Sequence, residues 1–355
     1  MIEGNAIIYC QGAFNTPGGK TTHGLVRFTR RYKVLSVIDA NYAGQDAGVV
    51  LDDKKSGIPV VASLEDALEN ARKRGERAQF LVIGMSPEGE RLSKTAREDI
   101  RHAINKGLNI DSGLHDFLSE DHVLMNQAIN NDTKIRDIRK PPKRKDLHFF
   151  TGKIEEVKSL KIAILGTDSS VGIRTSAWII VQGLEKAGIK TNLIGTSQTS
   201  WMQGARYSIP LCSIFKDFIA GEIENIVHEC WVNEQPEVMI LEGQGSLMNP
   251  AKPEGYELLA AGRADYVILQ HAPKRSEYDG CPGHKIHPLA DQVKAIEGIF
   301  GKKVIAITIN HEGLTKDEVP AVCNAIKAET GIPAFDVLLF QSDDVVRIIS
   351  ELRGK

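Results

Sequence analysis

The segment at residues 162–176, with the sequence IAILGTDSSVGIRTS, constrains the fold more than any other part of the chain. It has the pattern of a buried strand, a loop between Gly166 and Gly172, and the start of a helix. In a phosphate-binding loop, backbone N–H groups and the positive end of a helix converge on an anion. The usual pattern ends in Gly-Lys-Ser/Thr. Here Gly172 and Thr175 are present, but Ile173 stands at the lysine position. The segment therefore predicts an α/β domain with a modified phosphate cradle.

Composition excludes several classes of protein. The 355 residues suffice for two domains, and 42% hydrophobic and 25% charged content is typical of a soluble globular protein. A net charge of −2 gives no electrostatic reason to bind nucleic acid or an anionic membrane. No apolar run suits a membrane span or a signal peptide, and five scattered cysteines indicate reduced thiols. We expect a cytoplasmic homo-oligomer with a small-molecule substrate and no nucleic-acid or membrane partner.

Residues 1–150 alternate short apolar strands with helical segments, which predicts a Rossmann-like domain with a parallel sheet. Strands are expected at 6–10, 34–38, 80–84 and 108–114. The first strand–helix turn has no Gly-x-Gly-x-x-Gly sequence, so Asp39 is interpreted as a strand-end cap rather than a ribose ligand. The side chains that could line a cleft at the strand ends are Lys20, His23, His115 and Asp116. Local hydrogen bonding by the histidines is the alternative.

A basic segment with two adjacent prolines, Pro141 and Pro142, separates the two halves of the chain. Proline cannot continue a helix and stiffens the backbone, so a linker is expected at about 136–152, with the domain boundary near residue 150. Residues 153–355 then alternate strands and helices again, which predicts a P-loop NTPase-like, doubly wound parallel sheet. The expected strands are 161–165, 191–195, 238–241, 266–269 and 304–309.

Polar residues follow several of these strands, where ligands bind in open α/β sheets. Glu242 follows an apolar strand at the position where an acidic residue holds Mg²⁺ in nucleotide-binding folds. Asp168 could serve the same ion or a substrate, and Asn310 could read a base edge. Ordinary strand-end polarity explains each of them singly; together they indicate a ligand site.

A second polar loop lies between Gly195 and Gly204, and its hydroxyl and amide groups suit a substrate pocket, with a surface loop as the alternative. The candidate substrate-binding residues are Gln198, Thr199, Trp201, Gln203, Gln244, Ser246, His271 and Arg275, with Lys20 and His115 from the first domain. The spacing of Cys281, His284 and His287 is metal-like, but no second cluster completes a zinc site.

Short motifs along the whole chain carry a family resemblance. They are GQDAG at 44–48, GIPVVASL at 57–64, SGLHDFLSED at 112–121, RKPP at 139–142, GTD at 166–168, VG at 171–172, WMQG at 201–204, DFIAGE at 217–222 and EGQGS at 242–246. In these motifs the chain resembles the bacterial D-glutamate N-acetyltransferase family, a former domain of unknown function with a P-loop. The resemblance implies acetyl transfer from acetyl-CoA to the amine of D-glutamate. The second domain is also similar to dethiobiotin synthetase and cobyrinic acid diamide synthase, which use ATP.

The chain departs from the family pattern within the expected site. Ser169, Ile173 and Ser176 occupy the positions of a cysteine, a lysine and a threonine, and Cys212 stands at an aspartate position. The family's GTGQTG loop is GTSQTS here, at 195–200. Loss of a lysine–phosphate contact costs about 1.5–3 kcal/mol, unless Arg174 compensates. Phosphoryl transfer depends on that lysine more than CoA docking does.

The first hypothesis is therefore acyl transfer. The candidates for binding acetyl-CoA are Gly166, Thr167, Ser169, Ser170, Val171, Gly172, Arg174, Thr175, Ser176 and Asn310. Positive charge from Arg174, Lys274 or Arg275 would assist. Glu242 or Asp168 would accept a proton from the attacking amine, and backbone amides at 243–245 would stabilise the oxyanion.

Two alternatives remain open. The first is an ATP-dependent ligase or synthetase, in which Thr175 and Glu242 would hold Mg²⁺. The second is a nucleotide-binding protein without catalytic activity.

Overall fold

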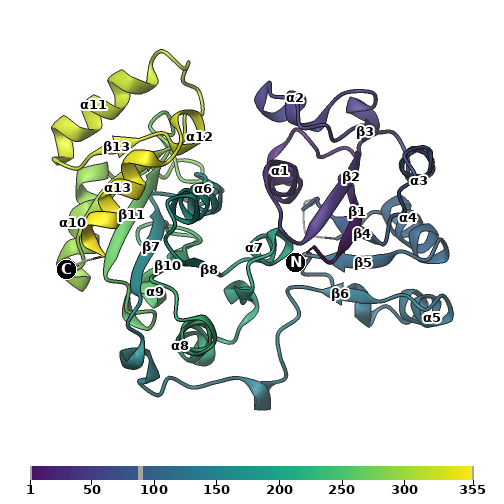
Figure 1. Ribbon diagram of the computed structural model, residues 1–355, viewed down its shortest axis with the longest axis horizontal. Helices are drawn as coiled ribbons and strands as arrows, with labels where there is room; N and C mark the ends of the chain where they lie inside the picture. The colour runs from purple at the N-terminus through teal and green to yellow at the C-terminus, as the bar shows by residue number, and fades with distance from the viewer. Residues whose placement is uncertain (1, 87–90, 354–355) are drawn as a thin grey trace. The chain divides into compact units, whose positions relative to one another are not determined.

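The structure is a computed structural model that describes residues 2–86 and 91–353. The chain forms two compact units: Met1–Pro141 with Gln198–Ala205, and Pro142–Ser197 with Arg206–Lys355. Each contains one parallel sheet flanked by helices, which confirms the predicted fold class (Figure 1). The assignment of residues 198–205 to the first unit has no counterpart in the sequence-based boundaries.

The first unit is built on a six-stranded sheet in the order β3-β2-β1-β4-β5-β6. Its strands are β1 (Gly4–Tyr9), β2 (Tyr32–Ile38), β3 (Val60–Val61), β4 (Phe80–Ile83), β5 (Asn109–Ser112) and β6 (Ile135–Asp137). Its helices are α1 (Lys20–Arg27), α2 (Ala47–Asp52), α3 (Leu64–Lys73), α4 (Lys94–Asn105), α5 (His122–Asn130) and α7 (Gln198–Gln203), with 3₁₀ turns η1 (Pro17–Gly19), η2 (Ala40–Tyr42) and η4 (Leu118–Glu120). In β1, Ile7 and Tyr9 join one core cluster and Ala6 and Ile8 the other, because alternate side chains point to opposite faces.

Local capping explains several element boundaries in this unit. Ser63 Oγ accepts the Asp66 N–H at 3.1 Å and donates to the Asp66 carboxylate, so Ser63 is the N-cap of α3. Asp39 accepts the N–H groups of Phe14 and Asn41, both at 2.9 Å, which confirms its interpretation as a strand-end cap.

The second unit is built on a seven-stranded sheet in the order β13-β12-β11-β7-β10-β8-β9. Its strands are β7 (Leu160–Gly166), β8 (Thr191–Gly195), β9 (Tyr207–Ser208), β10 (Val238–Glu242), β11 (Tyr266–His271), β12 (Val304–Ile309) and β13 (Ala334–Phe335). Its helices are α6 (Ile173–Lys186), α8 (Lys216–Glu234), α9 (Tyr256–Ala260), α10 (Leu289–Phe300), α11 (Val319–Thr330), α12 (Val337–Phe340) and α13 (Asp343–Leu352), with 3₁₀ turns η5 (Arg144–Asp146), η6 (Lys153–Glu156) and η7 (Leu211–Ser213). The strand β10 is buried along its whole length and β7 from Lys161 onward, as expected for the centre of a parallel sheet.

The segment expected to be a linker is fixed to α8 over residues 148–154. The carboxylate of Glu222, which is buried, accepts the His148 N–H at 2.7 Å. Buried Glu224 likewise accepts the Thr151 N–H at 2.5 Å. Gly221 lies against the backbone of His148, where a Cβ would come closer than 3.0 Å. These contacts give the DFIAGE motif a structural role in holding the connection.

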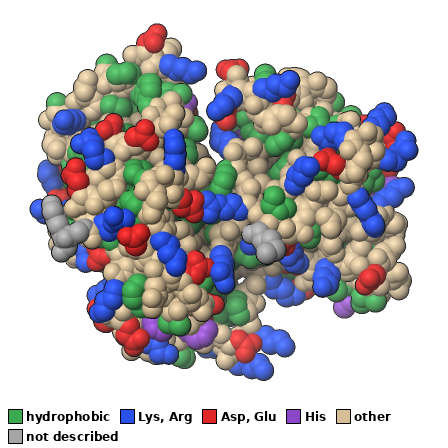
Figure 2. Space-filling view, viewed as in Figure 1, with side chains coloured by type: hydrophobic (Ala, Val, Ile, Leu, Met, Phe, Trp, Pro, Cys, Tyr) green, Lys and Arg blue, Asp and Glu red, His purple; other side chains and the backbone are tan. Residues whose placement is uncertain are grey.

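Charged side chains of both signs are interspersed over the face drawn in Figure 2. Within residues 2–86 and 91–353, no helix has the length and apolar character that crossing a membrane requires.

Candidate functional site

The loop between β7 and α6 has the geometry of an anion cradle. Gly172 is the N-cap of α6, with φ of 107°, a conformation that favours glycine, and no side chain caps the helix. The first N–H groups of any α-helix have no partner within the helix. The loop is also fixed to the neighbouring strand, because the Thr167 N–H donates to the Gln270 carbonyl at 2.9 Å. An uncapped helix start behind a fixed loop can accept a phosphate.

Asp168 holds this loop from within. It is fully buried, and its carboxylate accepts N–H groups from Ser169 (2.7 Å), Asn249 (2.8 Å), Arg275 (3.0 Å) and Asp279 (2.8 Å). With donors on both oxygens, the carboxylate is fully used by the protein itself. Asn249 and Asp279 were not among the candidates from the sequence, because neither lies at a strand end.

Arg275 is held against the loop by two carboxylates and a backbone carbonyl. Besides Asp168, its guanidinium donates to the Ser169 carbonyl at 2.8 Å and pairs with Glu312 at 2.9 Å. Burial opposes the charged form, but the hydrogen bonds from the guanidinium to Glu312 and Asp168 outweigh it and raise the pKa of Arg275. Lys274 is exposed.

Ile173 lies beneath the loop, not over the cradle. Its side chain is buried, and a Cβ built on Gly166 would lie 2.6 Å from Ile173 Cδ1. Arg174 and Thr175 follow it in the first turn of α6 and are half-buried. The lysine position is therefore part of the hydrophobic packing, and backbone groups form the cradle.

Gln270 joins the loop to β11 and β12 and was missed from the sequence. Its Oε1 accepts the hydroxyls of Ser176 and Thr308, each at 2.5 Å, and its Nε2 donates to the Val171 carbonyl at 3.1 Å. Asn310 lies beside it, since a Cβ on Gly172 would be 3.5 Å from Gln270 Nε2 and 3.8 Å from Asn310 Nδ2. The available signal was a polar residue directly after the apolar part of β11.

Glu242, at the end of β10, is held by the two residues that follow β8. Its Oε2 accepts the Thr196 N–H and its Oε1 accepts the Ser197 hydroxyl, both at 2.8 Å. Gln244 donates to the Thr196 hydroxyl at 2.7 Å. Buried Ser246 donates to Gln292 at 3.1 Å. The carboxyl end of β10 thus carries an ordered set of polar groups.

Two titratable groups near the loop have shifted pKa values. Burial lowers the pKa of His271 to about 4, so the ring is neutral near pH 7, and its Nδ1 lies 2.9 Å from the Thr167 hydroxyl. For Asp279, burial opposes ionisation, but hydrogen bonds from Ser169 and Ser170 outweigh it and hold its pKa below the usual value.

The remaining substrate candidates lie in the first unit. Lys20 is the exposed first residue of α1, and His115 is exposed after β5. The candidates Gln198, Thr199, Trp201 and Gln203 lie on α7. Thr199 Oγ1 is 2.9 Å from Thr21 Oγ1, and Gln203 Nε2 donates to the carbonyls of Gly24 and Phe28, each at 2.9 Å. These two side chains therefore attach α7 to α1.

Across residues 2–86 and 91–353, no group of three or more His, Cys, Asp and Glu side chains is arranged to hold a metal ion. His287, one of three residues with metal-like spacing, has its Nδ1 2.8 Å from the Tyr278 hydroxyl. Thr175 and Glu242 remain the prediction for Mg²⁺ in the ATP hypothesis.

A phosphate cradle between a buried strand and a helix, in a parallel sheet that follows a Rossmann-like unit, defines a two-domain P-loop protein. The chain matches the family described as "Domain of unknown function (DUF1611_C) P-loop domain" over residues 148–346. It matches the corresponding "Rossmann-like domain" (DUF1611_N) over residues 40–141. The chain belongs to the DUF1611 family, which confirms the resemblance found in its motifs.

Curated relatives and a solved structure agree with this assignment. A protein of Tritonibacter scottomollicae named D-glutamate N-acetyltransferase is 26% identical over 77% of this chain and 80% of its own length. A protein of the same name from a Pseudoalteromonas species is 26% identical over 76% of this chain and 80% of its own. The crystal structure of a DUF1611 protein from Anabaena variabilis has a TM-score of 0.88 at 25% identity, covering 98% of this chain and 99% of that one.

Proposed function

We propose that the protein transfers the acetyl group of acetyl-CoA to the amine of D-glutamate or a similar amino acid. The observation that carries the proposal is the uncapped start of α6 above a buried Ile173. Such a cradle binds phosphate through backbone N–H groups and lacks the lysine on which phosphoryl transfer depends. The name shared by the two curated relatives supports the same reaction.

In this proposal the residues of the loop have separate tasks. The N–H groups at the start of α6 hold a phosphate of CoA, and Arg275 fixes the loop through the Ser169 carbonyl. Asp168 holds the loop, because four N–H groups donate to its carboxylate and one of them belongs to the charged Arg275 guanidinium. Glu242, at the end of β10, is assigned as the proton acceptor, directly or through a water molecule.

The reaction is a nucleophilic substitution at the thioester. The amine nitrogen forms a bond to the acetyl carbonyl carbon, and the bond between that carbon and the CoA sulfur breaks. Glu242 takes a proton from the amine, and this proton ends on the departing CoA thiolate. The backbone amides of Gln244 and Gly245 donate to the oxygen that becomes negatively charged during the attack, whereas the Gly243 N–H, also expected to do so, donates to the Ile164 carbonyl at 2.9 Å.

The test is release of free CoA thiol from acetyl-CoA in the presence of D- or L-glutamate. Thermal shifts with CoA, acetyl-CoA and Mg-ATP complete it, because a ligand that binds only the folded state raises its stability. Glu242→Gln should lose turnover while acetyl-CoA still raises the melting temperature. Glu329→Gln, an exposed change on α11, should leave both unchanged. The proposal fails if neither turnover nor CoA binding occurs; stabilisation by Mg-ATP alone with phosphate release would indicate a ligase.

A further inference from the structure

The helix α7 comes from the sequence between β8 and β9 but folds as part of the first unit. It has six residues, and a helix this short is not stable without tertiary contacts. The contacts from Thr199 and Gln203 to α1 fasten one side of it. Contacts with residues of the first unit therefore determine where α7 lies.

The carboxyl end of α7 is capped by three consecutive residues of the first unit, Thr29, Arg30 and Arg31. The last carbonyls of a helix have no partner within the helix. Here the Thr29 hydroxyl donates to the carbonyl of Met202 at 3.2 Å, the Arg30 N–H to that of Gln203 at 2.8 Å, and Arg31 Nε to that of Trp201 at 2.7 Å. Gly204 allows this approach, since a Cβ there would lie 2.9 Å from Arg30 Cβ.

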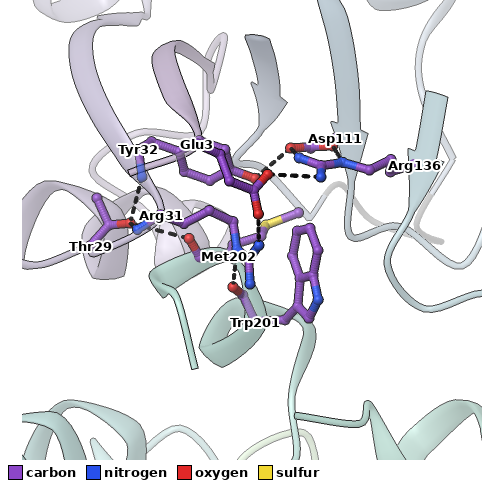
Figure 3. Close-up of polar contacts among 8 residues, drawn as sticks. All are labelled: Glu3, Thr29, Arg31, Tyr32, Asp111, Arg136, Trp201 and Met202. Carbon is purple, nitrogen blue, oxygen red and sulfur yellow. Dashed lines mark hydrogen bonds and ion pairs between the residues drawn. The ribbon is translucent and has the colours of Figure 1, made fainter. Parts of the chain in front are cut away.

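Arg31 also holds the indole of Trp201. Its guanidinium carbon lies 3.6 Å from the ring centroid, and that of Arg136 lies 5.0 Å from it, so two cations contact one aromatic ring. Glu3 accepts from both arginines, and fully buried Asp111 accepts from Arg136 and from Tyr32 (Figure 3). This network holds the Arg31 guanidinium in the orientation in which it contacts α7.

The two residues that precede α7 in the chain bind the carboxylate of Glu242. The unit boundary falls at the peptide bond between Ser197 and Gln198. On one side, the Thr196 N–H and the Ser197 hydroxyl donate to the Glu242 carboxylate. On the other side, α7 is gripped by the contacts just described. Ser197 is therefore joined both to the Glu242 carboxylate, through its hydroxyl, and to the first residue of α7, through its peptide bond.

We infer that Arg31 is a positioning residue for Glu242, acting through α7 and the donors at Thr196 and Ser197. The WMQG motif then attaches α7 to the first unit. Trp201 contacts Arg31, and Met202 is buried in the core of that unit. Gln203 donates to α1, and Gly204 permits the close approach of Arg30. The inference rests on the proposed function in so far as Glu242 is the proton acceptor.

The test compares Arg31→Met with Arg27→Met. Both remove an arginine from an ion pair in the first unit, but Arg27 pairs with Asp52. Arg31→Met should lower kcat roughly ten- to a hundred-fold, because small displacements of a catalytic group have effects of that size, and should leave the KM for acetyl-CoA unchanged. Arg31→Lys, which keeps the charge near the ring, should recover part of the loss and covers the case in which Arg31→Met does not fold. Arg27→Met should match the wild type.

A double-mutant cycle with Ser197→Ala identifies the route of the effect. If Arg31 acts through Ser197, the two losses in kcat will not multiply; multiplying losses would overturn the inference. Hydrogen exchange of the Thr196 amide gives a readout that needs no activity. It should be faster in Arg31→Met than in Arg27→Met and the wild type, and equal rates would also overturn the inference. An inactive wild type would remove the proposed function, and the exchange rates would still decide whether Arg31 positions Thr196.

Discussion

Arg275 donates to the fully buried carboxylate of Asp168 at 3.0 Å, across 107 positions of sequence. The arginine side chain is 17% exposed, so both charges are largely removed from water. This pair links the loop after β7 to the segment after β11. Its disruption should lower both the stability of the protein and its affinity for a ligand.

Asp168→Asn should lower the free energy of unfolding by about 3 kcal/mol, because it removes the buried one of the two carboxylates that pair with Arg275 and replaces an acceptor oxygen with an NH₂ group. Urea denaturation measures the change. Asp291→Asn, which removes an exposed carboxylate 3.3 Å from Lys294, should cost less than about 1 kcal/mol. Equal costs for the two variants would contradict the anchoring role of Asp168.

Gly221→Ala should destabilise the second unit by about 1–3 kcal/mol, because the added methyl group meets the His148 backbone and overpacking must displace it. Gly298→Ala on α10 is the matched control, since nothing lies within 4 Å of its added Cβ. That control should be neutral or stabilising by up to about 1 kcal/mol. Thermal denaturation of the two variants separates a close approach from ordinary helix propensity.

Ile173→Lys should lower the free energy of unfolding of the ligand-free protein by about 1–3 kcal/mol, because a charged group replaces buried apolar packing. CoA or ATP should recover part of this loss if the ammonium group then reaches a bound phosphate. Ile173→Met, which nearly conserves volume, should cost less than about 1.5 kcal/mol. An unchanged melting temperature in Ile173→Lys would show that position 173 is not a packing site.

The buried ring of His271 predicts a loss of stability in acid. Its pKa falls from 6.5 to about 4 on folding, so the unfolded state takes up a proton first as the pH decreases. Stability is full above 6.5 and is lost as the pH falls towards 4, by about 2–3 kcal/mol between pH 7.5 and 4.5. His271→Gln should show a smaller decrease than the wild type in urea titrations at those two pH values. Parallel decreases would mean that His271 is protonated in the folded state.

The strands of both sheets were predictable because each is a short apolar run bounded by turn residues. The expected strand at 304–309 is β12 (Val304–Ile309), and the loop after β7 lies where the glycine spacing placed it. Strand ends also pointed to Glu242 and Asn310. Gln270, Asn249 and Asp279 were not found in this way, because their partners lie 38 to 111 positions away.

The sequence by itself determined the two parallel-sheet domains, the modified phosphate loop and the family, because these follow from local periodicity and from motifs of a few residues. Only the tertiary structure decided that Ile173 is packing, that Asp168 is an anchor and that the WMQG helix belongs to the first unit. A helix as short as α7 has little intrinsic stability, so contacts with residues 21–31, far from it in the chain, select its place. The phosphate loop could be recognised in the sequence. The attachment of the residues that hold Glu242 could not.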